Sequence, residues 1–207
     1  LERYVELLKG FSSKSMGVVN LFGGFFSIAL MRFSESCRGA LKGVCHGLEY
    51  GEVRPVIPLG GGTPVARFYS RNLHHRLPPR TARQEMLLLN ALLSADSFHS
   101  EICCCPNCQS VIQHNPRVEV EAYFDFKEST YWVGSRRVSR EFPTALASDN
   151  CTRHYMWCKA WEYSQLLLSI DMLCDQLIDA DGKFRKELGA DHAGHAKVWA
   201  EVLSANL

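Results

Sequence analysis

Four of the chain's nine cysteines fall within residues 103–108, which read Cys-Cys-Cys-Pro-Asn-Cys. The two-residue gap between Cys105 and Cys108 lets two sulfur atoms meet one metal ion, and Cys103 supplies a third sulfur. Zinc favours a tetrahedral set of thiolate and imidazole ligands, and four protein ligands leave no position open for a substrate. The cluster therefore predicts a structural Zn²⁺ ion whose fourth ligand lies elsewhere in the chain.

Four downstream residues are candidates for the fourth ligand: His114, Cys151, His154 and Cys158. Two other interpretations stay open, a set of unliganded buried thiols and a redox pair formed by Cys105 and Cys108. The odd number of cysteines in a long chain favours a reducing compartment, where clustered thiols hold metals more often than they form bridges. A redox pair also needs a strand-to-helix context, which the sequence around the cluster lacks.

The composition indicates a globular protein with a sizeable core. The chain has 207 residues, of which 46% are hydrophobic and 22% charged, and its formal net charge is +1. These values exclude collagen-like and disordered chains. The longest uncharged apolar stretch, residues 17–31, is too short for a membrane span and is interrupted by Asn20 and Ser27. We therefore expect a cytoplasmic protein with no membrane span and no secretory leader.

The first half of the chain has a pattern of alternating helices and strands. Hydrophobic periodicity predicts helices over residues 1–15, 25–48, 65–77 and 81–94, and short buried strands over residues 16–22, 54–59 and 95–102. Such alternation with short connections is typical of parallel α/β units. About three units either pair in an open sheet or form the C-terminal portion of a (β/α)8 TIM-type barrel. We expect residues 1–102 to be this partial barrel.

The second half, residues 103–207, is expected to form a zinc-binding subdomain with an insertion and C-terminal helices. The predicted elements are a strand over residues 118–126, a long helix over 151–178 and a shorter helix over 192–203. Between the first two elements, Arg136, Arg137 and Arg140 lie among the aromatic residues Tyr131, Trp132 and Phe142. This pattern predicts phosphate contacts combined with base stacking, and an ordinary solvated loop is the alternative.

The motif Cys103-x-Cys105-x-x-Cys108, placed after a βα series, resembles the zinc motif of the tRNA-guanine transglycosylase family. Members of that family are (β/α)8 barrels that carry a zinc subdomain near the last strand. The resemblance implies that His154, which is followed by Tyr-Met-Trp, is the fourth zinc ligand. The interval between Cys108 and His154 is longer than in the family, which implies an insertion and favours the branch that modifies DNA.

Two further segments resemble the family. Gly23-Gly24-Phe25 is similar to a Gly-Gly-Leu segment whose backbone reads the guanine-like base, so the resemblance implies a substrate-binding role for Gly23, Gly24 and Phe25. Residues 95–99 are similar to a strand that carries two acids, of which the second is the nucleophile. His99 stands at that second position, so Asp96 is the expected catalytic carboxylate; a helix-capping role is the alternative.

The resemblance implies an enzyme that exchanges guanine for a 7-deazaguanine base in DNA or tRNA. A carboxylate attacks the glycosidic carbon in this chemistry and forms a covalent glycosyl-enzyme intermediate. We expect the chain, which begins at Leu1, to be the C-terminal part of such an enzyme, with nucleic acid, the base and an oligomer or partner protein as partners. The alternatives are a non-catalytic zinc-stabilised nucleic-acid-binding module, favoured by His99, and a zinc-dependent hydrolase in which His99 and the cysteines share an ion.

Overall fold

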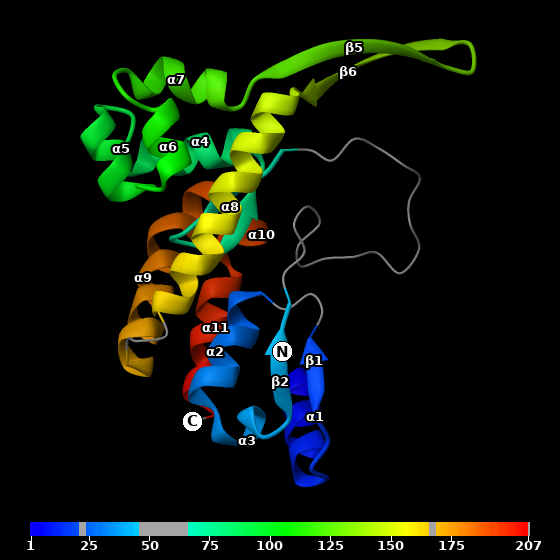
Figure 1. The fold of residues 1–207 in the computed structure, drawn as a ribbon, viewed down its shortest axis with the longest axis vertical. Coiled ribbons are helices and arrows are strands. Elements are labelled where there is room, and N and C mark those ends of the chain that lie inside the picture. Colours follow the sequence, from blue (N-terminus) through cyan, green and yellow to red (C-terminus); the bar gives the residue numbers. More distant parts are fainter. Residues whose placement is uncertain (21–23, 46–65, 166–168, 207) are drawn as a thin grey trace. The chain divides into compact units, whose positions relative to one another are not determined.

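The computed structural model describes residues 1–20, 24–45, 66–165 and 169–206 (Figure 1). The chain divides into two compact units. The first unit comprises Leu1–Ile57, Asn72–His74 and Lys159–Leu207, and the second comprises Pro58–Arg71 and His75–Cys158. The boundary expected after residue 102 therefore falls inside the second unit.

The first unit combines a small α/β motif with C-terminal helices. Its elements are α1 (Glu2–Ser13), β1 (Val18–Asn20), α2 (Phe25–Phe33), α3 (Glu35–Arg38), β2 (Leu41–Val44), α9 (Ile170–Leu188), α10 (Ala190–Ala193) and α11 (His195–Ser204). Strands β1 and β2 pair in parallel, with an irregularity between Val18 and Val19. The helices α2 and α3 connect them, so this part is a βαβ unit. Its first strand lies within the predicted strand 16–22, but β2 falls inside residues 25–48, which were predicted to be a single helix.

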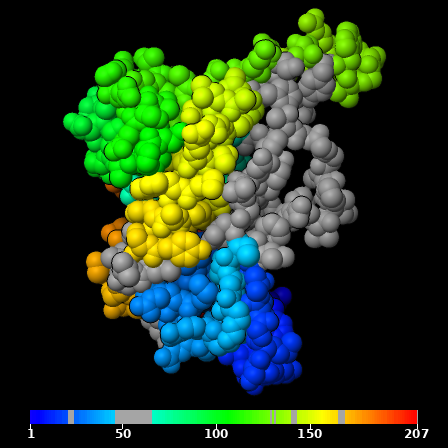
Figure 2. Space-filling view, viewed as in Figure 1, coloured from blue at the N-terminus to red at the C-terminus, as the bar shows by residue number. Residues whose placement is uncertain are grey.

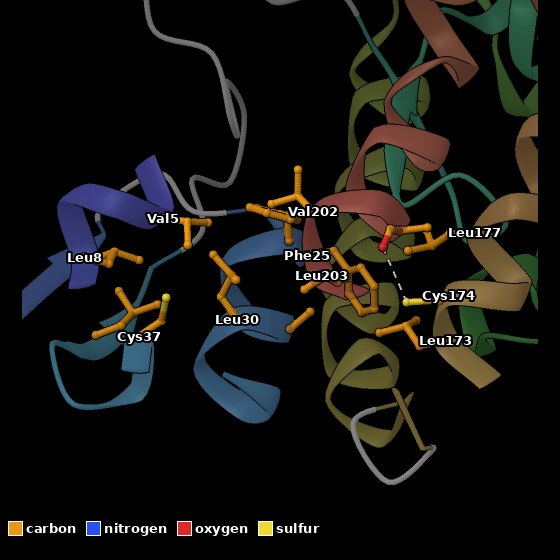
Figure 3. Packing of buried hydrophobic residues seen from close by; sticks show 14 of the residues in the cluster. Val5, Leu8, Phe25, Leu30, Cys37, Leu173, Cys174, Leu177, Val202 and Leu203 are labelled. Carbon is orange, nitrogen blue, oxygen red and sulfur yellow. Dashed lines mark hydrogen bonds between the residues drawn. The ribbon is translucent and has the colours of Figure 1, made fainter. Parts of the chain in front are cut away.

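The apolar core of the first unit joins these elements (Figure 3). Leu8 of α1, Leu30 of α2, Leu173 of α9 and Leu203 of α11 are each no more than 2% exposed and belong to one cluster. The thiol of Cys174 donates to the carbonyl of Ala200 at 3.7 Å. Burial of these side chains removes apolar surface from water, which is the main favourable contribution to the stability of such a unit.

The second unit contains two antiparallel hairpins and a set of short helices. Its elements are β3 (Phe68–Ser70), β4 (His75–Leu77), α4 (Pro79–Leu88), α5 (Ala95–Glu101), α6 (Pro106–Val111), α7 (Pro116–Tyr123), β5 (Phe126–Val133), β6 (Arg136–Pro143) and most of α8 (Ala145–Gln165). Proline occupies the first position of α4, α6 and α7, where its missing N–H is not needed and its φ angle suits a helix.

The β5–β6 hairpin extends away from the short helices of its unit as a two-stranded ribbon (Figures 1 and 2). Its two-residue turn contains Gly134 at φ +58°, a conformation that glycine adopts without steric cost and that suits the twist of a hairpin. Near the turn Trp132 is 69% exposed and lies opposite Arg137 in the register. The basic and aromatic segment expected around residues 131–142 is therefore part of a β-ribbon.

The described residues do not form the expected part of a barrel. Their strands make three separate two-stranded sheets, and only the β1–β2 pair is parallel. Residues 65–77, expected as a helix, contain the β3–β4 hairpin, whose turn includes His74 at φ +49°. The strand expected at 54–59 lies outside the described residues. What the structure supports is a mixed helix and strand fold that is mainly helical.

Two other predicted strands are helices. Residues 95–102 contain α5, because the hydroxyl of Ser94 caps its N-terminus by accepting a hydrogen bond from the backbone N–H of Ser97 at 3.1 Å. Residues 118–126 overlap α7, which begins at Pro116 and ends at Tyr123. The long helix expected over 151–178 is two helices, α8 and α9. None of the helices in the described ranges is both long and apolar enough to cross a membrane.

Candidate metal centre

Three cysteines and one histidine of the second unit converge on a single point. One ligand atom from each of Cys103, Cys105, Cys108 and His154 lies within 4.8 Å of all the others, and all four residues are buried. The distances from Nδ1 of His154 to Sγ of Cys108 and Cys105 are 3.5 and 3.7 Å. Sulfur and nitrogen ligands of a tetrahedral zinc ion are about 3.6 Å apart, given the usual bond lengths. The four residues can therefore bind a metal ion.

The local backbone explains how the three sulfurs are brought together. Cys105 precedes α6, and its sulfur accepts a hydrogen bond from the backbone N–H of Cys108 at 3.3 Å. The sulfur of Cys103 accepts one from the backbone N–H of Cys105 at the same distance. Such donors stabilise sulfur in the thiolate form, which is the form that ligates metals.

The imidazole of His154 is fixed in the orientation that a ligand needs. Its Nε2 atom lies 2.7 Å from the carbonyl oxygen of Tyr69, so Nε2–H donates there and Nδ1 is left to face the sulfurs. The ring also stacks on Phe68, with the ring centroids 4.1 Å apart and the planes 12° from parallel. The β3 strand thus holds the histidine from α8 in place.

The charges of the cluster favour a cation. Hydrogen bonds from Cys105 and Cys108 lower the pKa of Cys103 far below its usual range. Hydrogen bonds to Cys103 and Cys105 raise the pKa of Cys108. Burial alone lowers the pKa of His154, but its hydrogen bonds to Cys103 and Cys105 outweigh this effect and raise the pKa to about 9. The negative charge of the sulfur atoms thus favours a proton on His154. A divalent cation bound at the same point would neutralise this negative charge instead.

The other cysteines and His114 have different surroundings. The buried Cys158 lies one turn after His154 on α8, with its sulfur 3.5 Å from Nε2 and 3.7 Å from Nδ1, yet outside the set of four mutually close donors. Cys151 is also buried, and its burial raises the pKa to about 12. Cys104 and His114 are exposed. All nine cysteines are free thiols in the structure.

The predicted catalytic residue belongs to the second unit, and the predicted substrate-binding residues that the structure describes belong to the first. Asp96 is exposed in the first turn of α5, so the strand end on which its catalytic role was predicted is absent and the helix-terminus alternative describes its position. Gly24 precedes α2 as its N-cap. Phe25 is fully buried and stacks on His74 at 3.6 Å, which makes it a core residue of the first unit. Gly23 lies outside the described residues.

The arginines that were predicted to contact phosphate lie on β6. Arg136 and Arg137 are exposed on β6. Arg140 is also on β6, opposite Ser129, but its side chain lies outside the described ones. Nδ1 of His99 lies 3.1 Å from the carbonyl of Cys103 and Nε2 lies 2.9 Å from that of Ile112. Both ring nitrogens of His99 thus lie within hydrogen-bond distance of backbone carbonyls, and His99 is not among the four mutually close donors.

The structure also contains a buried charged cluster in the first unit, which the sequence did not suggest. The carboxylate of Glu162 lies 2.9 Å from Nδ1 of His74 and 2.9 Å from Nζ of Lys159, and all three side chains are buried. The three-residue spacing of Lys159 and Glu162 on a helix was a readable signal of pairing, whereas His74 lies 88 residues from Glu162 in sequence.

Comparisons of the chain with protein-family models, curated proteins and solved structures found no match. The metal-binding geometry of Cys103, Cys105, Cys108 and His154 is therefore the strongest guide to function.

Proposed function

We propose that the chain is a zinc-stabilised nucleic-acid-binding module. The observation that carries the proposal is the set of four buried donors, Cys103, Cys105, Cys108 and His154. Thiolate and imidazole ligands in a compact tetrahedral arrangement select Zn²⁺ over hard cations such as Mg²⁺ and Ca²⁺. Four protein ligands leave no open position, so the ion would connect α6, α8 and the residues after α5 rather than perform chemistry. A thiolate site of this kind also suits the reducing cytoplasm.

The surface that we assign to nucleic acid is the β5–β6 ribbon. Trp132 and Arg137 are directly opposite each other, so their side chains share one face near the turn. Arg136 lies opposite Val133 on the other face, and it is exposed like Arg137. A two-stranded ribbon fits the major groove of a duplex, guanidinium groups bind phosphates, and an indole ring stacks on unpaired bases.

A salt-dependence experiment tests this proposal. Fluorescence anisotropy with labelled DNA duplexes and RNA hairpins gives the dissociation constant at several salt concentrations. The double variant Arg136→Gln with Arg137→Gln removes two cations from the ribbon, so the slope of log K against log[salt] should fall by about 2 for duplex DNA. Arg80→Gln with Arg117→Gln is the control, because it removes the same charge from exposed positions on α4 and α7 of the same unit. Equal slopes for both double variants, or no binding at low salt, would contradict the proposal.

A second candidate is the base-exchanging transglycosylase. The spacing of the three cysteines and the helix-borne ligand His154 support it. In this reaction the carboxylate of Asp96 attacks the glycosidic carbon as the bond to guanine breaks, and a general acid gives guanine the proton that it takes when it leaves. The incoming 7-deazaguanine base then loses its ring N–H proton to the same group as its nitrogen displaces the carboxylate. Denaturing gels of protein incubated with DNA or tRNA should show a covalent adduct that Asp96→Ala abolishes. An adduct that survives this substitution would show that Asp96 is not the nucleophile. The absence of any adduct would contradict the transglycosylase proposal.

A further inference from the structure

An open groove of about 320 Å³ lies beside the metal centre in the second unit. It is lined by residues of α6 and of the middle of α8, together with one metal ligand: Cys105, Pro106, Asn107, Ser110, Arg153 and Trp157. Because Cys105 is one of the four donors of the candidate metal centre and also lines the groove, an ion bound there would fix one wall. The groove is at the small end of the range of ligand sites, which suits one small ligand such as a nucleotide.

Arg153 gives the groove a cation that solvent can reach. Its side chain is 66% exposed, and its Nε atom lies 2.8 Å from Oδ2 of Asp149, one turn earlier on α8. A guanidinium carries five N–H donors, and this ion pair occupies only the one on Nε. The terminal amino groups therefore remain able to bind a phosphate, although Asp149 reduces the local positive charge.

Trp157 gives the groove an aromatic surface. It is half-buried, one turn after Arg153 on α8, and the guanidinium of Arg71 lies 5.7 Å from its ring centroid. An indole ring that is fixed by a neighbouring cation is a stacking platform for a planar base. Arg153 and Trp157 are four residues apart on a helix and thus project from the same face.

The polar atoms of α6 supply hydrogen-bond acceptors. The amide nitrogen of Asn107 donates to the hydroxyl of Tyr123 at 3.3 Å and to the carbonyl of Asn150 at 3.2 Å. Its Oδ1 atom has no hydrogen bond from a described residue. The hydroxyl of Ser110 donates to the carbonyl of Asn107 at 2.8 Å and keeps lone pairs available. A complementary ligand therefore combines a planar ring that carries N–H donors with an anionic group.

We propose that this groove binds one nucleotide of a single-stranded nucleic acid, with its base on Trp157 and its phosphate on Arg153. The inference rests on the proposed function, because it takes a nucleic acid as the ligand, but it uses a different surface from the β5–β6 ribbon. Thymine and guanine suit the acceptors of Asn107 and Ser110, since both bases carry ring N–H donors.

The test uses the full chain with zinc bound and a fluorescein-labelled twelve-nucleotide strand of thymidines, with anisotropy as the readout. We expect Trp157→Leu to weaken binding about tenfold, in line with the loss of one stacked base. Arg153→Gln should weaken it at low salt and reduce the salt slope by about 0.7. Arg185→Gln is the matched control, because Arg185 is also an exposed arginine that pairs with an aspartate one turn earlier on a helix. Metal content and thermal unfolding check that each variant is folded.

The outcomes separate this inference from the proposed function. If Trp157→Leu and Arg153→Gln both bind the strand as the parent does, the proposal that the groove binds a nucleotide is wrong, even if the ribbon variants lose affinity. Loss of strand binding in the groove variants, with ribbon variants unaffected, supports the groove and counts against the ribbon. If the protein binds free thymidine monophosphate but not the strand, the ligand is a free nucleotide, and the proposal that the groove binds single-stranded nucleic acid is wrong. Because Arg153 is exposed, Arg153→Gln keeps the test decisive if Trp157→Leu fails to fold.

Discussion

The Nε2 atom of His154 lies 2.7 Å from the carbonyl oxygen of Tyr69, 85 residues earlier in the chain. This contact makes a backbone group of β3 determine which nitrogen of the α8 histidine faces the sulfurs. The metal centre therefore depends on three separate parts of the second unit: the β3–β4 hairpin, the residues from the end of α5 into α6, and α8. The stability of that unit and its metal content should change together.

Cys105→Ser should remove the metal and destabilise the second unit. Cys105 supplies a ligand and its sulfur accepts the hydrogen bond that caps α6, so one substitution affects both. We expect the metal-to-protein ratio to fall from one to near zero, with a lower unfolding temperature. Cys104→Ser is the control, because Cys104 is adjacent but exposed. Mass spectrometry of bound metal and calorimetry measure both effects; a Cys105→Ser protein that is as stable as the parent without metal contradicts a structural role.

Cys158→Ala should leave one metal ion bound. Its sulfur is 3.5 Å from Nε2 of His154, the nitrogen that already faces the carbonyl of Tyr69, and it lies outside the group of four close donors. We expect the visible spectrum of the cobalt-substituted protein to keep the intensity of three thiolate ligands in this variant. His154→Ala should instead weaken metal binding. A loss of one thiolate from the cobalt spectrum of Cys158→Ala would show that Cys158 is a ligand.

Zinc binding should release protons and strengthen as the pH rises. In the metal-free site the pKa of His154 is raised to about 9 and that of Cys108 is also raised, so both hold protons at neutral pH and must lose them to ligate. Protonated His154 stabilises the metal-free fold. This contribution is fully present below the unfolded pKa of about 6.5 and is lost as the pH rises through about 9.

Two measurements check this prediction. Titration of the metal-free protein with zinc in weak buffer at pH 7 should release more than one proton per ion. The metal-free protein should unfold at a lower urea concentration at pH 9.5 than at pH 6.5. The same comparison on the His114→Asn variant, which changes an exposed histidine, shows how much of this difference comes from an unrelated histidine. A zinc affinity that is constant between pH 6 and pH 9 contradicts the assignment.

The three cysteines of the candidate metal centre were predictable because their signal is local and chemical, whereas the choice of His154 among four candidates rested on the resemblance. Cys103, Cys105 and Cys108 lie within six consecutive residues, and their ability to ligate a metal can be recognised without knowing the fold. The support from Tyr69 was not predictable, since a backbone carbonyl has no sequence signature. Trp157 is half-buried and lines the groove beside Cys105, and its place there depends on tertiary packing that the neighbouring sequence does not reveal.

The helices that replace predicted strands show how tertiary context and capping decide short segments. Val118, Val120, Ala122 and Phe124 alternate with polar residues as in a strand. In α7, however, Val118 is 63% exposed and Val120 is buried, because Pro116 starts a helix whose buried side combines Val120 with Tyr123. The carboxylate of Glu119 also accepts a hydrogen bond from the backbone N–H of Asn115 at 3.0 Å, which stabilises the helix start. Pro116 and Glu119 at the start of α7 therefore favoured a helix more strongly than the alternation of apolar and polar residues favoured a strand.

Glu162→Gln should destabilise the first unit much more than an exposed glutamate substitution. Glu162 is fully buried, and its two oxygens pair separately with His74 and Lys159. Glutamine keeps the shape but removes the charge, so buried Lys159 loses its carboxylate partner. Breaking such a buried pair costs about 3–5 kcal/mol. The free energy of unfolding in urea, followed by circular dichroism, measures the effect.

The matched control for Glu162→Gln is Glu201→Gln on α11 of the same unit. Glu201 is 61% exposed and lies 3.8 Å from Lys197, so its pairing is with an exposed lysine and the change should cost less than about 1 kcal/mol. The double variant Glu162→Gln with Lys159→Met removes both charges of the buried pair and should recover part of the lost stability. Equal effects of the two single variants contradict the view that this buried carboxylate organises the first unit, because burial is what separates Glu162 from Glu201.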